Sequence, residues 1–417
     1  MTAAQQLAID GGAPVRTDPF PAWPSVPTDG REAVARVLES GDINYWTGTE
    51  CRTFEREYAS YLGVEHTLAV ANGTLALEIA LRALNVGPGD EVIVPSRTFI
   101  ATAGAVVAVG ATPVVVDIDP ETNALTPLTI AQALTPRTRA VIVVHLGGYP
   151  ADMPAILELT SQLGLKVVED CAQAHGATIN GRQVGTFGDA GCFSFCQDKI
   201  LPLGEGGLIA LRDGEVYARA WSYRDHGRDL ELAQGDPLVA ADSPAASFRW
   251  LTTTFGSNAR LGEMEGALGC ATLRHLPEYV AQRRANALAL ADALSSEAHL
   301  RVLTPAPGFP CEPSYYRLYA LLDTDALAPG WTRDRVIAAI VAEGVPAQYG
   351  SCALIGHEAA FDTIDLSGAP KVALPGAQRA HERSIAFLVH PTAAVADMAD
   401  VATAVTKVLA HATGGER

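Results

Sequence analysis

The sequence predicts an α/β protein with a mainly parallel sheet, because short β-branched runs alternate with segments of helical periodicity between residues 67 and 189. Strands separated by helices in this way form β-α-β units, in which consecutive strands lie parallel in one sheet. A chain of 417 residues with 48% apolar side chains can bury such a sheet on both faces. The predicted strands cover residues 67–70, 91–94, 113–117, 140–145 and 166–169.

The helical patterns lie between these strands. In residues 74–84 the apolar positions from Ala76 to Ala83 follow the spacing i, i+3, i+4, i+7, and residues 153–163 are similar. Residues 98–116 carry no charge, but glycines and Pro113 interrupt them before they reach the ~20 apolar residues of a membrane span. We expect a buried helix followed by a strand there.

The pattern changes near residue 270. A long helix rich in Arg and Ala is expected at residues 275–295, then strands near 315–322 and helices at 333–343 and 395–413. We therefore predict an N-terminal arm (residues 1–30), a large domain (31–270) and a small C-terminal α/β domain (271–417). A loop at residues 237–244 is expected to project from the large domain.

Composition excludes several functional classes. A net charge of −17 would repel a polyanion, so we expect no nucleic-acid partner. The seven cysteines lack paired CxxC spacing, which indicates reduced thiols and no structural metal. The first ten residues lack the basic and apolar regions of a secretory signal, so we expect a cytoplasmic location.

Lys199 is one of only four lysines among the 30 basic residues, and it lies in an apolar, glycine-rich stretch. A desolvated ammonium group can lose its proton and attack a carbonyl, whereas a guanidinium group stays charged. Lys199 is therefore the candidate Schiff-base lysine. A surface lysine is the ordinary alternative.

Two segments predict an anion site near this lysine. Gly73 and Thr74 stand where a strand turns into a helix, and the unpaired N–H groups at a helix N-terminus attract phosphate. Ser194 lies five residues before Lys199 and offers another hydroxyl donor. An ordinary threonine N-cap and a structural glycine turn are the alternatives.

Asp170 ends a predicted buried strand. In open α/β sheets the carboxyl ends of the strands face the ligand crevice, so its carboxylate is placed to pair with a cationic ring nitrogen. The alternative is a helix-capping aspartate with Glu169 exposed beside it.

These segments resemble the DegT family of pyridoxal-phosphate sugar aminotransferases, which have the aspartate-aminotransferase fold, fold type I. The resemblance covers nearly the whole chain. Its motifs, in order, are Trp46-Thr-Gly48 with Phe54-Glu55, Asn72-Gly-Thr74, Thr98-Phe99, His145-Leu-Gly147, Glu169-Asp-Cys-Ala-Gln173, Ser194-Phe195, Lys199, Gly204-Glu-Gly-Gly207, Arg224-Asp-His-Gly227, Asn258-Ala-Arg260, Glu263 and Phe387-Leu-Val-His-Pro-Thr392.

The resemblance implies that Lys199 forms a Schiff base with pyridoxal 5′-phosphate and that Asp170 pairs with the ring nitrogen. It further implies that Gln173 lies near the phenolic oxygen and that Phe99 stacks on the ring. The implied phosphate donors are Gly73, Thr74, Ser194 and, from the neighbouring subunit, Asn258. The resemblance therefore also implies a homodimer with shared active sites.

Substrate contacts are less clearly marked. Trp46, His226 and His390 are candidates, with core packing or an ordinary surface histidine as the alternatives. Leu203 stands where relatives often carry a small hydroxyl residue, and Ala259 stands where they often carry an aromatic residue. These two differences bear on the choice of substrate more than on the binding of the cofactor.

The implied activity is transfer of an amino group from L-glutamate or L-glutamine to a keto-sugar in amino-sugar or antibiotic biosynthesis. A nucleotide-linked keto-deoxyhexose is the first acceptor expected, and a ketocyclitol of the scyllo-inosose type is the next. A pyridoxal-phosphate sugar dehydratase is a second hypothesis, but relatives of that kind replace the lysine with histidine, so Lys199 argues against it. A non-catalytic regulator that binds the cofactor is the third.

Overall fold

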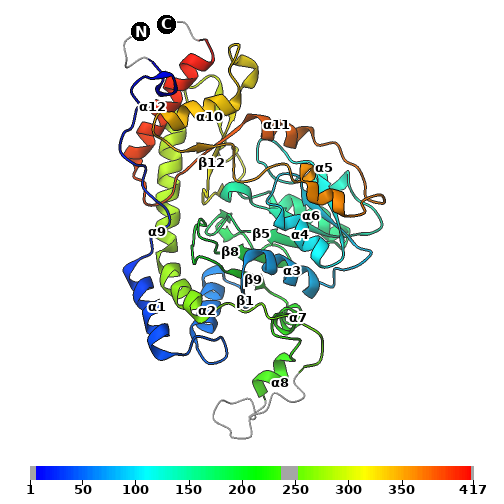
Figure 1. Cartoon of the computed structure of the whole chain (residues 1–417). Coiled ribbons are helices and arrows are strands. Elements are labelled where there is room, and N and C mark those ends of the chain that lie inside the picture. The colour runs from blue at the N-terminus through cyan, green and yellow to red at the C-terminus, as the bar shows by residue number, and fades with distance from the viewer. Residues whose placement is uncertain (1–5, 236–251, 415–417) are drawn as a thin grey trace.

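The computed structural model describes residues 6–235 and 252–414, and within them it confirms the α/β architecture (Figure 1). The central feature is a seven-stranded sheet in which β9 runs antiparallel to both neighbours and the remaining adjacent pairs are parallel. In order across the sheet, the strands are β1 (His66–Val70), β9 (Gly207–Leu211), β8 (Ala190–Ser194), β5 (Lys166–Asp170), β4 (Thr138–Val144), β2 (Glu91–Pro95) and β3 (Thr112–Val116). All five predicted strands are present.

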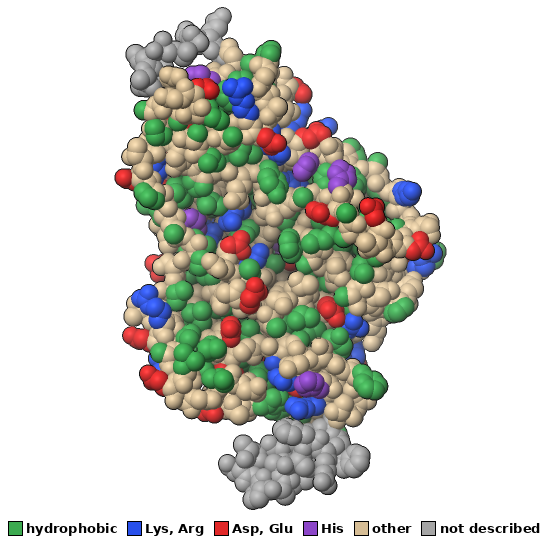
Figure 2. Space-filling model, in the orientation of Figure 1, with side chains coloured by type: hydrophobic (Ala, Val, Ile, Leu, Met, Phe, Trp, Pro, Cys, Tyr) green, Lys and Arg blue, Asp and Glu red, His purple; other side chains and the backbone are tan. Residues whose placement is uncertain are grey.

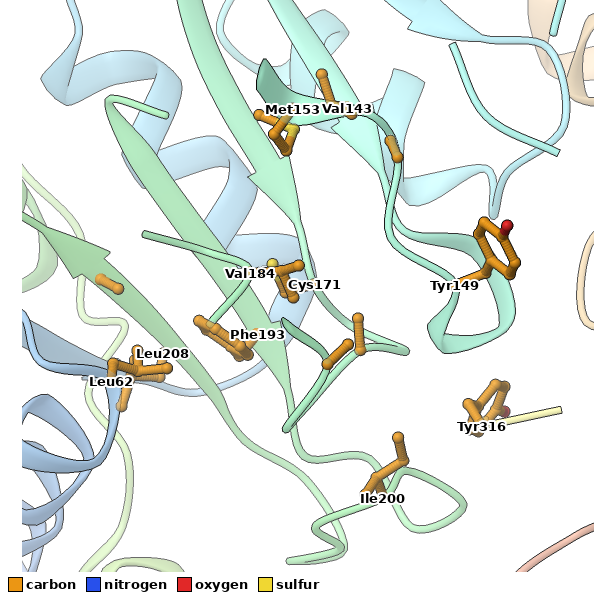
Figure 3. Packing of buried hydrophobic residues seen from close by; sticks show 14 of the residues in the cluster. Leu62, Val143, Tyr149, Met153, Cys171, Val184, Phe193, Ile200, Leu208 and Tyr316 are labelled. Carbon is orange, nitrogen blue, oxygen red and sulfur yellow. The ribbon is translucent and has the colours of Figure 1, made fainter. Parts of the chain in front are cut away.

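Two apolar layers cover this sheet, one on each face. Along β4, Ala140 and Ile142 join a cluster with α3, α4 and α7, while Val141 and Val143 join a cluster with α2 and α6. Figure 3 shows part of the second cluster. The helices in this part of the chain are α2 (Glu50–Leu62), α3 (Gly73–Ala83), α4 (Ala101–Ala108), α5 (Pro127–Ala131), α6 (Met153–Gln162), α7 (Gly214–Arg224) and α8 (Leu230–Gly235).

A four-stranded antiparallel sheet organises the C-terminal third of the chain. Its order is β10 (Leu300–Val302), β12 (Leu318–Leu322), β14 (Ser384–Phe387) and β13 (Ala347–Gln348). α10 (Arg333–Ala342) and α12 (Val395–Ala412) cover it through one apolar cluster. α11 (Pro375–Arg383) lies beside β12 but places Ala377 and Ala380 in a cluster of the seven-stranded sheet. A small three-stranded sheet of β11 (Cys311–Glu312), β6 (Thr178–Ile179) and β7 (Arg182–Gln183) connects this region with the part of the chain that forms the seven-stranded sheet.

Helix α9 (Glu263–Ala293) runs along both regions (Figure 1). Its first half packs against α1 (Thr28–Ser40) through Ala267 and Ala271, and its second half places Leu290 in the core of the C-terminal sheet. The helix begins twelve residues before the predicted start at 275, so position 270 lies inside it. The division into three parts remains a prediction.

The loop predicted at residues 237–244 lies outside the residues that the structure describes. None of the helices in residues 6–235 and 252–414 combines the length and apolarity needed to cross a bilayer. On the face shown in Figure 2, acidic and basic side chains of the described residues are interspersed.

Candidate active site

A cavity of about 730 Å³ opens at the carboxyl ends of the parallel strands. This volume lies within the range of small-molecule and cofactor sites. Seven of the predicted site residues line it: Gly73, Thr74, Phe99, Asp170, Gln173, Ser194 and Lys199. Tyr316 and Ser351 line it from the C-terminal third of the chain. The structure thus brings together residues that are as much as 279 positions apart in the sequence, from Asn72 to Ser351.

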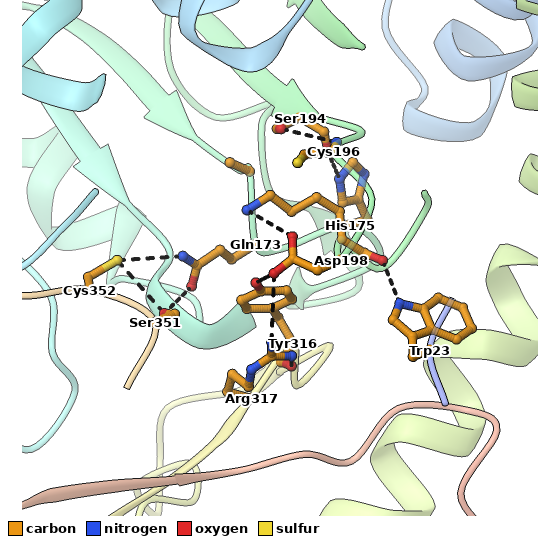
Figure 4. A network of polar contacts seen from close by, with 12 residues as sticks. Trp23, Gln173, His175, Ser194, Cys196, Asp198, Tyr316, Arg317, Ser351 and Cys352 are labelled. Atoms are coloured by element: carbon orange, nitrogen blue, oxygen red, sulfur yellow. Dashed lines mark hydrogen bonds and ion pairs between the residues drawn. The ribbon is translucent and has the colours of Figure 1, made fainter. Parts of the chain in front are cut away.

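Lys199 lies on the turn between β8 and β9, with its side chain 16% exposed. Its Nζ atom lies 3.9 Å from Oδ1 of Asp198 and 5.0 Å from the ring centre of Tyr316. The indole Nε1 of Trp23 donates to the backbone carbonyl of Lys199 at 3.0 Å (Figure 4). The amine therefore borders the cavity while an N-terminal residue holds its backbone.

Asp170 ends β5 and is 7% exposed. Its carboxylate accepts from the hydroxyl of Thr102 at 3.0 Å and from the backbone N–H of Ala172 at 3.1 Å. Burial raises the pKa of the Asp170 carboxyl, and these two hydrogen bonds, with the charge of Lys199, oppose that shift only in part. A cationic group in the cavity would stabilise the ionised carboxylate further.

Glu169 is the neighbour of Asp170 on β5, and its side chain is fully buried. Its two oxygens accept from the backbone N–H groups of Gly185, Phe187 and Gly188 at 2.7–2.8 Å, and Oε2 lies 3.1 Å from Nε2 of His145. The alternative that left Glu169 exposed is therefore wrong. His145, Glu169 and Cys171 place ligand atoms within 4.8 Å of one another, but hydrogen bonds already use the imidazole and the carboxylate.

The predicted anion site is the N-terminus of α3. The side chain of Asn72 caps the helix by accepting from the N–H of Leu75 at 3.0 Å, and the first N–H groups of a helix have no intrahelical partner. A Cβ atom on Gly73 would lie 2.6 Å from Cβ of Ser194, so only glycine allows this close approach. Gly73, Thr74 and Ser194 thus meet at one end of the cavity.

His175 holds the strand that carries Ser194. Burial lowers the pKa of His175 to about 3, so its imidazole is neutral. Nε2 lies 2.8 Å from the carbonyl of Ser194 and Nδ1 lies 2.7 Å from the hydroxyl of Tyr58, so Nε2–H donates to the carbonyl and Nδ1 accepts from the hydroxyl. These two buried hydrogen bonds fix the end of β8 beside the cavity.

Phe99 and Gln173 are the remaining predicted residues that line the cavity. Phe99 is 62% exposed, which is unusual for a phenylalanine, so its ring does not pack in the core. The side-chain oxygen of Gln173 accepts from the N–H of Gly147 at 2.8 Å and from the hydroxyl of Ser351 at 3.1 Å. Ser351 therefore orients Gln173 from across the cavity.

Four predicted site residues do not line this cavity. Asn258 and His226 are exposed, Trp46 packs edge-on against Trp221, and His390 is buried with its Nδ1 atom 2.8 Å from the hydroxyl of Thr392. The roles of these four residues remain predictions. The role predicted for Asn258 is to donate to the cofactor's phosphate in a neighbouring subunit.

Several cavity residues escaped sequence reasoning. Asp198 and Thr102 lie close to predicted site residues in the sequence, so their polar side chains could have marked them as further candidates. Tyr316 and Ser351 belong to turns more than 100 residues from Lys199, and no local pattern marks them.

Comparisons with known proteins identify the family of this chain. Residues 25–406 match the DegT/DnrJ/EryC1/StrS aminotransferase family. The chain is 38% identical to the L-glutamine:2-deoxy-scyllo-inosose aminotransferase of Streptoalloteichus tenebrarius over 97% of this chain and 98% of that protein. It is 46% identical to the UDP-N-acetyl-3-dehydro-alpha-D-glucosamine 3-aminotransferase of Acidithiobacillus ferrooxidans over 60% of this chain and 63% of that one.

A solved structure of another aminotransferase has the same fold. An aminotransferase from Psychrobacter cryohalolentis matches with a TM-score of 0.89 at 42% identity, covering 94% of this chain and 100% of that chain. The family match, the full-length relative and the shared architecture are mutually consistent. The chain therefore belongs to the DegT/DnrJ/EryC1/StrS aminotransferase family and is an aminotransferase of fold type I.

Proposed function

We propose that this aminotransferase binds pyridoxal 5′-phosphate and transfers an amino group from L-glutamine or L-glutamate to the ketone of a polyol ring. The observation that carries the proposal is that one cavity brings together the Lys199 amine, the buried Asp170 carboxylate and the N-terminus of α3. Aminotransferases of this family are pyridoxal-phosphate enzymes, and the relatives named above act on a ketocyclitol and on a keto-sugar.

The donor set fits this cofactor. Asp170 supplies a carboxylate whose raised pKa a cationic ring nitrogen would lower, and the exposed Phe99 supplies an aromatic face for the ring. Gly73, Thr74 and Ser194 supply phosphate donors at one end of the cavity. When bound, the cofactor supplies an aldehyde that condenses with amines and a ring that withdraws electrons from the substrate carbon.

The chain's own residues then perform two tasks. Lys199 would hold the cofactor through its Nζ atom and, when released, would take and return the proton of the substrate's α-carbon. Asp170 would hold the ring nitrogen in its protonated form. Transfer in two half-reactions, in which the product of the donor leaves before the acceptor binds, lets one lysine serve both halves. This division predicts ping-pong kinetics.

A ketocyclitol is the acceptor we favour, which reverses the order expected from the sequence. Lys199 is the only basic residue among the described residues that line the cavity, whereas Asp198 and Glu205 also line it. A nucleotide diphosphate is usually bound by several cations, so this lining suits an uncharged polyol better. A nucleotide-linked keto-sugar is the second candidate, favoured by the 46% identity to the UDP-sugar enzyme.

The proposal includes a homodimer and a cytoplasmic location. Phe255 is fully exposed and lies three residues from Asn258, which is exposed as well. Exposed aromatic groups are typical of contact surfaces, so this segment is proposed to reach the cavity of a second copy. The seven free cysteines are consistent with a reducing compartment.

Stepwise spectroscopy tests the function. The holoenzyme is treated with L-glutamine, and the cofactor absorbance should bleach as nitrogen is transferred to it. After removal of the donor, 2-deoxy-scyllo-inosose, scyllo-inosose and UDP-linked keto-sugars are added separately, and the absorbance should return with a ketocyclitol. Return with only a UDP-linked keto-sugar would support the second candidate, and absorbance indifferent to every amino donor would contradict transaminase activity on this site.

A further inference from the structure

Trp23 contacts the backbone of Lys199 from outside the cavity. Its indole Nε1 donates to the carbonyl of Lys199 at 3.0 Å (Figure 4), although Trp23 itself does not line the cavity. Within residues 6–235 and 252–414, no backbone N–H donates to this carbonyl. Because a backbone carbonyl that is shielded from water needs a donor, the indole supplies a hydrogen bond that the local fold does not provide.

The loop that carries Lys199 has few hydrogen bonds of its own. The N–H of Lys199 donates to the carbonyl of Cys196 at 3.0 Å, and the N–H of Leu203 donates to the carbonyl of Phe195 at 2.9 Å. The bond from Trp23 acts between these two points, at the residue that bears the amine. Without this bond, the peptide that follows Lys199 would have no hydrogen-bond partner among the described residues.

Packing fixes the direction of the indole N–H. The Trp23 ring stacks on that of His390, with an interplanar angle of 14° and 6.3 Å between the ring centres, and the Tyr279 ring meets it edge-on at 5.3 Å. The guanidinium carbon of Arg283 lies 5.1 Å from the Trp23 ring centre, where its charge is attracted by the π face. Tyr279 and Arg283 belong to α9, and His390 follows β14. The groups that hold the indole are therefore separate from the loop that the indole holds.

Thr392 and His390 also hold the residue before Trp23. The Thr392 hydroxyl donates to the carbonyl of Ala22 at 2.8 Å. Because this bond uses its only proton, the hydroxyl accepts from Nδ1–H of His390, which lies 2.8 Å away. Burial, with the nearby charges of two arginines, lowers the pKa of His390 to about 4, so the ring that stacks on Trp23 is neutral near pH 7.

The N-terminal segment, residues 7–27, is anchored on both sides of Trp23. Upstream, the buried carboxylate of Glu343 accepts from the backbone N–H groups of Ala8 at 2.8 Å and Val15 at 3.1 Å. Downstream, the buried face of α1 packs against α9. A tryptophan that is anchored in this way does not move with the Lys199 loop, so its indole fixes the Lys199 carbonyl relative to α9.

We propose that Trp23 is a positioning residue for amino-group transfer, because its indole determines where the Lys199 amine stands beside the reacting carbon. The inference rests on the proposed function, in which one amine takes and returns the proton of the substrate's α-carbon. The rate of such a transfer falls steeply when the reacting groups are displaced by about 1 Å. The lysine side chain is long and flexible, so the position of its backbone defines the volume that Nζ can reach.

The test separates proton transfer from binding and folding. Trp23→Phe keeps an aromatic ring beside His390 and removes the indole N–H. Single-turnover bleaching of the cofactor absorbance is measured with a saturating amino donor, L-glutamine or L-glutamate, and with the same donor deuterated at the α-carbon. The bleaching rate constant should fall about tenfold, as for loss of one hydrogen bond, and the deuterium isotope effect should rise. The half-saturating donor concentration and the cofactor dissociation constant should stay at their wild-type values.

Two further variants give a matched control and a second route to the same bond. Trp331→Phe makes the same change at a half-buried tryptophan that packs against the core of the C-terminal sheet, and it should leave the rate constant and the isotope effect unchanged. Thr392→Val removes the hydroxyl that holds Ala22, so it should slow bleaching and raise the isotope effect by smaller factors. Thermal unfolding measures the stability of each variant, and borohydride trapping counts the sites that hold cofactor.

A wild-type rate constant in Trp23→Phe would overturn the proposal. A slower rate with an unchanged isotope effect, explained by a lower melting temperature or weaker cofactor binding, would overturn it as well. If Trp23→Phe does not fold, Thr392→Val decides the question, because wild-type values in that variant would contradict the proposal. Failure of the wild-type enzyme to bleach with either donor would instead count against the proposed function, so the two failures are distinguishable.

Discussion

The two walls of the cavity differ in construction. The seven-stranded sheet and its helices contribute Asp170 and the N-terminus of α3 at the ends of buried elements, where packing and backbone hydrogen bonds fix each group. The C-terminal third contributes Tyr316 and Ser351 from turns, and their hydroxyl groups donate to Asp198 and Gln173 of the first wall. A fixed wall suits a cofactor that stays, and a wall of turns suits substrates that exchange.

A second comparison lies within the fixed wall. Glu169 and Asp170 are adjacent carboxylates on β5, and successive residues of a strand point to opposite faces. Glu169 accepts three backbone N–H groups and contacts a histidine, whereas Asp170 accepts one backbone N–H and one hydroxyl beside the cavity. The first carboxylate is committed to the fold, and the second keeps capacity for a ligand.

The largest expected effect is the loss of turnover in Lys199→Ala. The variant should retain cofactor through the fixed wall, but its transamination rate should fall more than about a thousandfold because no amine remains to move the proton. Equilibrium dialysis of the cofactor and a coupled glutamate assay measure the two quantities. Near-normal turnover would remove Lys199 from its assigned role.

Glu169→Ala should mainly affect stability. The substitution leaves three buried backbone N–H groups and the His145 ring without their partner, so we expect the free energy of unfolding to fall by about 3 kcal/mol or more. Urea titration of the cofactor-free protein measures this change. A loss below about 1 kcal/mol would refute the structural assignment of this carboxylate.

Asp170→Asn should have opposite effects on catalysis and on stability. The neutral amide cannot stabilise a cationic ring nitrogen, so we expect turnover to fall about a hundredfold, as for removal of other preorganised electrostatic partners. Turnover equal to that of the wild type would reject the proposed ring partner.

The pH dependence of stability in this variant follows from the pKa of Asp170. Because burial raises the folded-state pKa above the unfolded value, ionised Asp170 destabilises the cofactor-free protein as the pH rises through the folded-state pKa. Cofactor-free Asp170→Asn should therefore melt at a higher temperature than the wild type above that pKa, and the difference should disappear at acid pH. Calorimetric scans from acid to mildly alkaline pH would show a constant difference if the account is wrong.

Gly73→Ala should give the smallest effect. Its Cβ atom would crowd Ser194 and displace the N-terminus of α3, so we expect cofactor affinity to fall roughly tenfold, the size of one lost hydrogen bond to an anion. Gly104→Ala in α4 is the matched control, because no atom lies within 4 Å of its added Cβ. That change should leave affinity intact and stabilise the helix by about 0.5–1 kcal/mol.

The same difference between the walls explains what the sequence predicted. The fixed wall consists of residues next to predicted strands and helix starts, so local patterns and family motifs identified Gly73, Asp170 and Lys199. The start of α9 was missed because Arg- and Ala-rich periodicity becomes clear only after residue 275, although the helix begins at Glu263. Tyr316 and Ser351 reach the site only through tertiary packing, which no local pattern records.

Reductive trapping tests the central claim most directly. The holoenzyme is treated with borohydride, which fixes a Schiff base between lysine and cofactor, and is then digested for mass spectrometry. Of the four lysines, Lys166, Lys199, Lys371 and Lys407, only Lys199 borders the cavity, so the account predicts the cofactor-derived mass on the peptide containing Lys199. The label on any other lysine, or no label on a protein shown to contain the cofactor, would contradict it.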